Sequence, residues 1–186
     1  MPALSHRAPL TAVVYTEGVT AERLLQTVAK RLEDQGHALA GFLQRDEWTP
    51  GRARCDMVLA ELHSDTAICV SQDLGPGSRG CRLDLAAMMA AMAKAIAALD
   101  RSPDLLIINK FGKTESEGGG FRPLISAAVE RGVPVLIAVP HVNVEAWRLF
   151  AGDLAAEHTL SALPSEGAAL LPALGLESRA PAEAGS

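Results

Sequence analysis

The sequence is poor in the residues that mark several common protein classes. Aromatic residues make up 4% of its 186 residues, and its three cysteines, Cys55, Cys69 and Cys81, include no Cys-x-x-Cys pair. An odd set of cysteines with this spacing indicates neither a disulfide framework nor a zinc knuckle. The five histidines are scattered, with no spacing that places two on one helical face. We therefore expect reduced thiols and no metal site.

The chain also lacks an excess of basic residues and any long apolar run. Its 17 Lys and Arg against 22 Asp and Glu give a net charge of −5, which offers no general attraction to nucleic acid or anionic lipid. No stretch reaches the roughly 18 to 20 apolar residues of a membrane span, and the first ten residues have no signal-peptide core. The sequence predicts a cytoplasmic protein with neither a nucleic-acid nor a membrane partner, and it predicts no particular oligomeric state.

What is present is typical of a globular α/β protein. Hydrophobic residues make up 48% of the sequence, with several alanine-rich stretches. A chain of this length is expected to form a single domain, which we place over residues 11–176. Residues 1–10 are predicted to be a flexible N-terminus, and residues 177–186 a disordered tail.

The first forty residues carry the pattern of a strand, a helix and a second strand. Residues 11–15 (TAVVY) are a short run rich in β-branched residues, and residues 21–35 place leucine and valine at helical spacing. Thr20 is the predicted N-cap of this helix, and Gly36 its predicted stop. Residues 38–43 (ALAGFL) predict the second strand. This order indicates a right-handed crossover and a parallel pair.

A loop and an antiparallel hairpin are predicted next. Residues 45–54 are polar and contain a Pro-Gly pair, which predicts a loop. Residues 56–62 (DMVLAEL) and 66–72 (TAICVSQ) are two strand-like runs separated by three residues, which is the spacing of a β-hairpin. The sheet is therefore expected to be mixed.

The second half alternates helices with buried strands. Residues 104–109 (DLLIIN) form a nearly continuous apolar run, which suits a strand covered on both faces. Trp147 and Phe150 are predicted to pack in the core. The remaining predicted elements are helices over residues 83–99, 121–131, 144–150 and 165–174, and a strand over residues 133–139.

Three loops qualify as ligand sites. In open α/β sheets, ligands bind beyond the carboxyl ends of the parallel strands. The loops that are predicted to lie there span residues 16–20, 73–82 and 109–120.

The first loop has the position of a phosphate-binding P-loop but not its sequence. Of a G-V-G-K-T motif only Gly18 and Val19 remain; Thr20 stands at the last glycine, Ala21 at the lysine and Glu22 at the Mg²⁺-binding hydroxyl. Without the lysine, the β- and γ-phosphates lose their fixed positive charge, so a standard triphosphatase cradle is disfavoured. Gly18 and Thr20 remain candidates for holding a neutral or singly charged group. The alternative is a capped structural turn.

The second loop contains residues 75–80 (GPGSRG), formally the G-x-G-x-x-G pattern of dinucleotide-binding proteins. The pattern is weak here because the preceding strand is predicted to be a hairpin partner, and because Asn109 stands where an acidic residue is expected. Arg79 and Arg82 are candidate ligands for an oxyanion at the start of the following helix. The alternative is a flexible turn with solvated arginines.

The third loop gives the strongest signal. Asn109 and Lys110 follow a buried strand at the point where many nucleotide hydrolases carry a carboxylate that holds Mg²⁺. Lys113 and Arg122 add positive charge to the same segment. Asn109, Lys110, Lys113 and Arg122 are therefore candidate ligand-binding residues.

The same loop also carries acidic residues and glycines. Glu115 and Glu117 are positioned to pair with the lysines or to orient a water molecule. Gly118, Gly119 and Gly120 permit a close backbone approach and offer unhindered amides to a ligand. The alternative is a solvated, salt-bridged loop with a flexible glycine hinge.

These residues resemble a known class. A strand, the Gly18-Val19 turn, a helix, a second strand, a hairpin and then residues 105–115 (LLIINKFGKTE) are similar to the small P-loop nucleoside triphosphatases over residues 11–149. Residues 81–84 (CRLD) with residues 109–122 resemble more closely an uncharacterised bacterial family described as NTPase-like and loosely associated with molybdate transport. The resemblance implies a P-loop-NTPase-like three-layer sandwich, with a mostly parallel central sheet and an antiparallel hairpin.

The sequence differs from this class at the motif positions that bind phosphate and Mg²⁺. Ala21 and Glu22 replace the lysine and hydroxyl of the first motif, and Asn109 replaces the aspartate of the second, while Gly112 and Glu115 keep the later pattern. The resemblance therefore implies the fold and not the hydrolysis.

The leading hypothesis is a P-loop-like protein that binds a small anionic ligand, a nucleotide or an oxyanion such as phosphate or molybdate, without the standard ATPase machinery. One alternative is a slow nucleoside triphosphatase that uses Mg²⁺, with Lys113 replacing the missing lysine and Glu115 positioning water as the catalytic residue. A further alternative is a regulatory module that docks a partner through the third loop.

Overall fold

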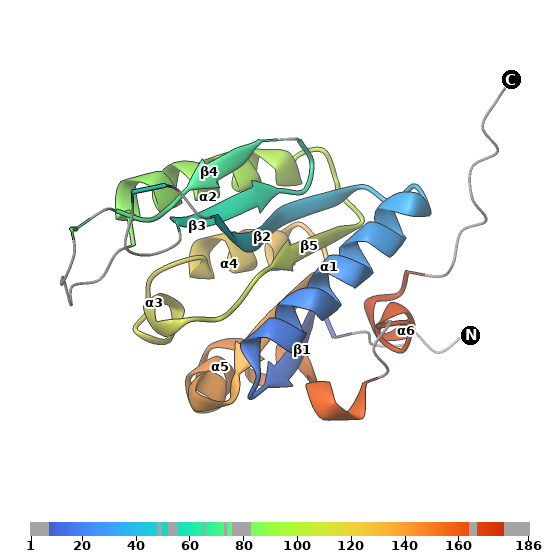
Figure 1. Cartoon of the computed structure of the whole chain (residues 1–186). Coiled ribbons are helices and arrows are strands. Elements are labelled where there is room, and N and C mark those ends of the chain that lie inside the picture. Colours follow the sequence, from blue (N-terminus) through green and yellow to red (C-terminus); the bar gives the residue numbers. More distant parts are fainter. Residues whose placement is uncertain are drawn as a thin grey trace, which may run out of the picture.

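The computed structural model describes residues 8–47, 50–51, 56–64, 66–72, 74–75, 83–163 and 167–176. Within these ranges seven strands form one sheet in the order β4-β3-β2-β5-β6-β1-β7, with helices on both faces (Figure 1). The strands are β1 (Leu10–Tyr15), β2 (Leu39–Glu47), β3 (Asp56–Glu61), β4 (Ala67–Cys69), β5 (Leu105–Ile108), β6 (Val135–Pro140) and β7 (Ala155–Thr159).

The sheet is mostly parallel with an antiparallel excursion at one edge. β1 pairs in parallel with β6 and β7, and β5 pairs in parallel with β2 and β6. β3 runs antiparallel to β2 and to β4. The predicted α/β class and the hairpin are therefore confirmed. The predicted parallel pair of the first two strands is wrong, because β5 and β6 lie between β2 and β1 in the sheet.

The helices divide between the two faces of the sheet. They are α1 (Gly18–Asp34), α2 (Leu85–Leu99), α3 (Lys113–Ser116), α4 (Arg122–Glu130), α5 (Val144–Ala151) and α6 (Leu170–Leu174). One buried apolar cluster joins the sheet to α2, α4 and α5, and a second joins its opposite face to α1 and α6 (Figure 1). The result is the expected three-layer arrangement. Successive side chains of a strand point to opposite faces of the sheet, so both faces of β5 are covered: Ile107 faces the second cluster and Ile108 the first.

Several predicted boundaries are wrong. The helix α1 begins at Gly18, so Thr20 lies inside it and the N-cap position is Glu17. The strand β2 continues to Glu47 because residues 42–47 pair with β3, although residues 45–47 were predicted as loop. The last helix is shorter than predicted, since residues 167–169 precede α6 without helical structure.

The edge strand β7 was missed altogether. Its sequence, AAEHT, shows no apolar alternation, and its residues are half-buried or exposed. Its strand conformation comes from parallel pairing with β1, which matches Leu10 with Ala155 and Val14 with Thr159.

The aromatic residues near α5 pack as predicted. Trp147 is fully buried, and its ring lies edge-on to Phe111, with 5.3 Å between the ring centroids. Phe150 stacks on Phe111 at 5.8 Å.

None of the helices in the described ranges combines the length and apolar character needed to cross a bilayer. The predicted disordered tail, residues 177–186, lies outside those ranges.

Candidate functional site

The carboxyl ends of the parallel strands lie along one edge of the sheet, and two cavities open there. The first, which we call the β1 pocket, lies at the ends of β1, β6 and β7. The second, the β5 pocket, lies at the end of β5 and beside β2, β3 and α2. Because β6 separates β1 from β5, the two strand ends are about 10 Å apart, or two strand spacings.

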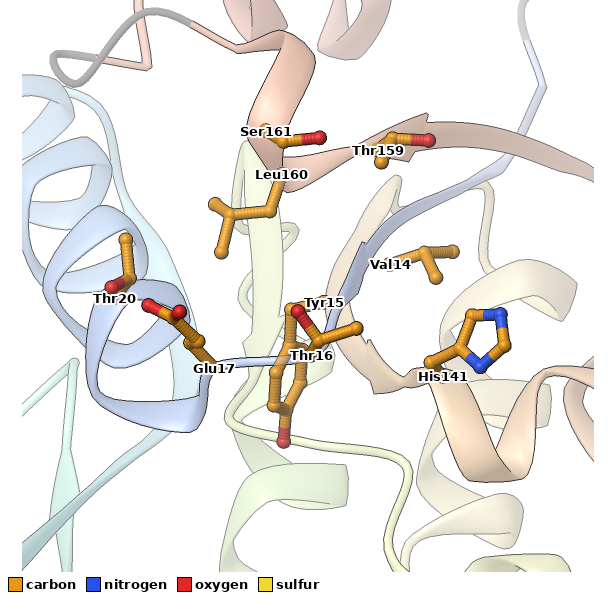
Figure 2. A pocket seen from close by; sticks show the side chains of 9 residues that line it. All are labelled: Val14, Tyr15, Thr16, Glu17, Thr20, His141, Thr159, Leu160 and Ser161. Atoms are coloured by element: carbon orange, nitrogen blue, oxygen red, sulfur yellow. The ribbon is translucent and has the colours of Figure 1, made fainter.

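The β1 pocket is a cavity of about 290 Å³ lined mainly by hydroxyl and other polar side chains. Figure 2 shows Glu17 and Thr20 on the α1 side of this pocket and His141 on the opposite side. Its lining residues are Val14, Tyr15, Thr16, Glu17, Thr20, His141, Thr159, Leu160 and Ser161.

The connection from β1 to α1 beside this pocket is very short. Only Thr16 and Glu17 lie between the last residue of the strand and the first residue of the helix. Glu17 makes no side-chain hydrogen bond to the free amides of the first turn. Of the predicted residues in this loop, Thr20 lines the pocket, whereas Gly18 starts the helix behind it.

Tyr15 is half-buried at the base of this connection. Burial raises the pKa of its phenol above the ordinary value, and the negative charge of Glu22 raises this pKa further. The phenol therefore stays protonated and remains a hydrogen-bond donor up to strongly alkaline pH.

The β5 pocket is a cavity of about 260 Å³ with a mostly apolar wall. The loop 109–115 forms one side of it, and β2, β3 and α2 supply residues far away in sequence. The lining residues are Gln44, Met57, Leu59, Val70, Leu83, Met88, Asn109, Lys110, Gly112, Lys113, Thr114, Glu115 and Phe121.

Asn109 is the unusual residue of the β5 pocket. It is 6% exposed, and both polar atoms of its side-chain amide are buried without a hydrogen-bond partner among the described residues. Leaving a buried polar group unpaired costs about 1 to 3 kcal/mol. Both atoms are inaccessible to water, so the amide does not form part of the pocket surface.

The two lysines of the loop also line the β5 pocket. The Lys113 side chain is 87% exposed and lies 3.7 Å from a carboxylate oxygen of the exposed Glu117. An exposed pair of this kind contributes little and is easily exchanged for another partner. Lys110 is half-buried and has no ion pair with a described residue. Both ammonium groups are thus available to an anion.

Glu115 organises the backbone of the loop. It is 4% exposed, and its two carboxylate oxygens accept hydrogen bonds from the amides of Gly112 and Phe121, each at 2.9 Å. The carboxylate therefore ties the start of α3 to the start of α4. Its use as a water-positioning catalytic residue stays a prediction.

Arg122 is also committed to local contacts. Its Nε atom donates to the carbonyl oxygen of Glu115, and its guanidinium carbon lies 4.8 Å from the Phe150 ring centroid and 5.5 Å from that of Phe111. It is absent from the lining of both pockets. The structure thus places Arg122 behind the loop, where cation–π contacts hold it.

The glycines of the loop serve mainly its own folding. The amide of Gly118 donates to the Glu115 carbonyl at 3.1 Å, and that of Gly119 to the Thr114 carbonyl at 2.9 Å. A Cβ atom on Gly120 would collide with the Glu115 carboxylate. These contacts occupy two of the three amides that were predicted to bind a ligand, and the ligand-binding role of the three glycines stays a prediction.

The second predicted loop lies mostly outside the described residues. Arg79 and Arg82 both fall there, so their predicted role as an oxyanion clamp is not tested. Within the described ranges, no three His, Cys, Asp or Glu side chains gather closely enough to hold a metal ion.

Sequence reasoning missed several lining residues. His141 lies just after the predicted strand 133–139. Because ligands bind beyond the carboxyl ends of parallel strands, this position could have been named from the sequence. Thr159 and Ser161 were missed because β7 was not recognised. No local pattern marks Gln44 or Met57 as neighbours of Asn109, since only strand pairing and packing bring them together.

The sheet order and the three layers are those of a P-loop-NTPase-like fold. A protein of similar fold is THEP1 from the hyperthermophile Aquifex aeolicus, with a TM-score of 0.58 and 17% sequence identity over 88% of this chain and 95% of that chain. At this sequence identity, the structural similarity shows a similar fold and does not extend to function.

The chain belongs to the family described as "Protein of unknown function (DUF2478)", whose sequence profile matches residues 10–165. The resemblance to an NTPase-like family is thereby confirmed. A similar protein is "Molybdenum import ATP-binding protein ModC 2" of Bradyrhizobium diazoefficiens, which is 32% identical over 145 residues. The match covers 78% of this chain and 16% of that protein, so the chain corresponds to a small part of this relative.

Proposed function

We propose that this protein binds a small anionic ligand, a nucleotide or an oxyanion such as phosphate or molybdate, at the β5 pocket. One observation carries the proposal: two available lysines, Lys110 and Lys113, line this cavity at the carboxyl end of β5. The lysines supply charge and hydrogen-bond donors for the anion.

Two features support ligand binding without the standard ATPase machinery. The link between β1 and α1 has two residues, whereas the G-x-x-x-x-G-K-[ST] cradle needs a longer loop to surround phosphates. Ala21 and Glu22, at the positions of the motif's lysine and hydroxyl, both lie within α1. The first motif is on this basis a degenerate Walker A motif.

The hydrolase alternative receives less support. A water-positioning base must have a free lone pair directed at the water. Both carboxylate oxygens of Glu115 accept backbone hydrogen bonds in a site that is 4% exposed. Each oxygen keeps a second lone pair, so the burial of Glu115, and not its hydrogen bonding, is what limits the access of water to it.

The relatives suggest which anions to examine first. The name of the Bradyrhizobium protein refers to ATP binding and to molybdenum import, and this chain matches 16% of that protein. The name therefore motivates ATP and molybdate as probes, with inorganic phosphate as the reference oxyanion.

The proposal predicts that charge removal at the pocket weakens binding. Isothermal titration with ATP, phosphate and molybdate is expected to detect binding of at least one anion to the wild-type protein. Lys110→Ala and Lys113→Ala are each expected to weaken it by roughly three- to tenfold, about 0.6 to 1.4 kcal/mol. The effect should shrink as ionic strength rises, because exposed charges are screened.

The matched control is Lys30→Ala. Lys30 is an exposed lysine on α1 that pairs with Asp34 at i,i+4, as Lys113 pairs with Glu117, but it does not line either pocket. Its substitution should leave binding unchanged. Arg122→Ala is not a suitable variant because that side chain supports the loop. Absence of binding to the wild type, or equal binding by all three lysine variants, would contradict the proposal.

A further inference from the structure

The helix α2 is apolar on every side, although one side of it faces outward. Lys94 is the one charged or polar residue among its 15 residues. Its buried side packs on the sheet beside α4 (Figure 1). Its outward side, which we call the α2 face, consists of the exposed residues Leu85, Ala86, Met89, Ala90, Ala93, Lys94 and Ala97. A helix on the surface of a soluble protein normally carries polar and charged side chains there. The α2 face therefore has the composition of a contact surface.

Two long side chains protrude from this face. Leu85 is 59% exposed and Met89 is 64% exposed, and they lie about one helical turn apart. The alanines beside them leave the surface of the helix shallow. Small residues at a contact allow two helix axes to approach to about 8 Å. The face thus offers both a protruding part and a shallow part that can receive one.

The α2 face is complementary to itself when two copies of the helix lie antiparallel. If Met89 of each copy faces the other, a two-fold axis passes between them, and Leu85 lies level with the partner's Ala93. A long side chain then packs over a small one. Lys94 lies level with the partner's Asp84, the carboxylate that caps the helix, so opposite charges approach each other. The antiparallel order also places opposite ends of the two helix dipoles side by side. A second copy of this chain therefore matches the face in shape and in charge.

A lipid surface is a poorer match for the α2 face. Helices that lie in a membrane interface carry several lysines and arginines on their polar side. The helix α2 has Lys94 alone, and the chain has a net charge of −5. Anionic lipid repels a chain of this charge, whereas a second apolar face loses no hydrogen bonds when it covers the first.

We propose that two copies of this protein associate through the α2 face as an antiparallel, two-fold symmetric pair. A helix of 15 residues is about 22 Å long and about 10 Å wide. This contact is well below the roughly 800 Å² per partner of a standard interface, so the pair is weak and depends on concentration. The α2 face is separate from both pockets, because none of its residues lines either of them.

Sedimentation equilibrium of the full chain, at concentrations from about 10 μM to about 1 mM, tests the pair. Wild-type protein is expected to shift from monomer towards dimer across this range. Met89→Asp and Met89→Lys each bring two like charges together at the two-fold axis, so each should weaken the dimer at least tenfold. An equal mixture of the two variants should restore it, because the introduced carboxylate then faces the introduced ammonium group.

The matched control is Leu149→Asp. Leu149 is 90% exposed and lies on α5, outside the α2 face, so this substitution should leave the dimer unchanged. Urea midpoints of the variants show that each one folds. A wild-type protein that stays monomeric at the highest concentration overturns the proposed pair. So does a mixture of the two Met89 variants that associates no better than either variant alone, or a loss at Leu149 as large as that at Met89.

Discussion

Two glutamates of one loop show how burial decides the role of a side chain. Glu115 and Glu117 are two positions apart. The first is buried and holds two backbone amides, whereas the second is exposed and forms a loose pair with Lys113. From the sequence, both were candidates for pairing with lysines or orienting water, and Glu115 was the one named for catalysis. Glu115 lies within α3 and accepts from the amide of Gly112 before that helix and from the amide of Phe121 after it, whereas Glu117 follows the helix and remains exposed.

The titration of Tyr15 provides a prediction at the scale of one residue. Tyr15 is the single tyrosine of the chain, so the ultraviolet absorbance of tyrosinate reports on it alone. Its midpoint is expected above pH 10 in the folded protein and at about 10 in urea, because burial and Glu22 disfavour the phenolate.

The same shift predicts a pH dependence of stability. Since the folded-state pKa is the higher one, the unfolded chain releases its proton first as the pH rises above about 10. The free energy of unfolding should therefore fall more steeply in this range for wild type than for Tyr15→Phe. Identical slopes, or a folded-state midpoint at or below 10, would refute this account.

Among the elements, β2 pairs with β5 at a position where only a glycine fits. Gly41 lies opposite Ile107 in the parallel pair and has a φ of +106°. A Cβ atom there would collide with the backbone carbonyl of Ile107. A glycine inside a predicted strand is a recognised sign of close backbone approach, yet only the pairing identifies the neighbour. The register of β2 on β5 is also what brings Gln44 to the β5 pocket.

Gly41→Ala is accordingly expected to destabilise the fold by roughly 2 to 4 kcal/mol, the sum of backbone strain and a steric clash. Gly36→Ala is the control. Gly36 also has a positive φ, of +77°, but a Cβ atom there meets no other atom within 4 Å. It should cost only about 1 kcal/mol. Urea unfolding followed by circular dichroism measures both, and equal losses would show that the strand contact is unimportant.

For the whole molecule, the folded core extends beyond the segment that defines the family. The family profile ends at residue 165, but α6 follows it and packs into the same cluster as α1. Leu170, Leu171 and Leu174 of this short helix are all buried. Residues after the family segment therefore complete one face of the sheet.

Leu174→Ala is expected to destabilise the protein by about 2 to 4 kcal/mol. Leu174 is 1% exposed, so its truncation leaves a cavity in the core. Leu149→Ala, at a position that is 90% exposed, should change the free energy of unfolding by less than about 0.5 kcal/mol. Denaturant midpoints compare the two. A loss at Leu174 no larger than that at Leu149 would mean that α6 does not support the core.

The sequence alone determined the α/β class, the antiparallel hairpin and the strand that precedes the Asn109 loop. These features follow from periodicity and apolar runs, which are local properties of a chain. It also located the loops that follow β1 and β5 at the carboxyl edge, because parallel strands present their ends together. The tertiary structure decided the rest. The edge strand β7 exists through its pairing with β1, and the β5 pocket unites Asn109 with Met57 and Met88. Whether a charged or polar residue faces a pocket, a backbone amide or solvent depends on neighbours distant in sequence, and only the packed molecule fixes those neighbours.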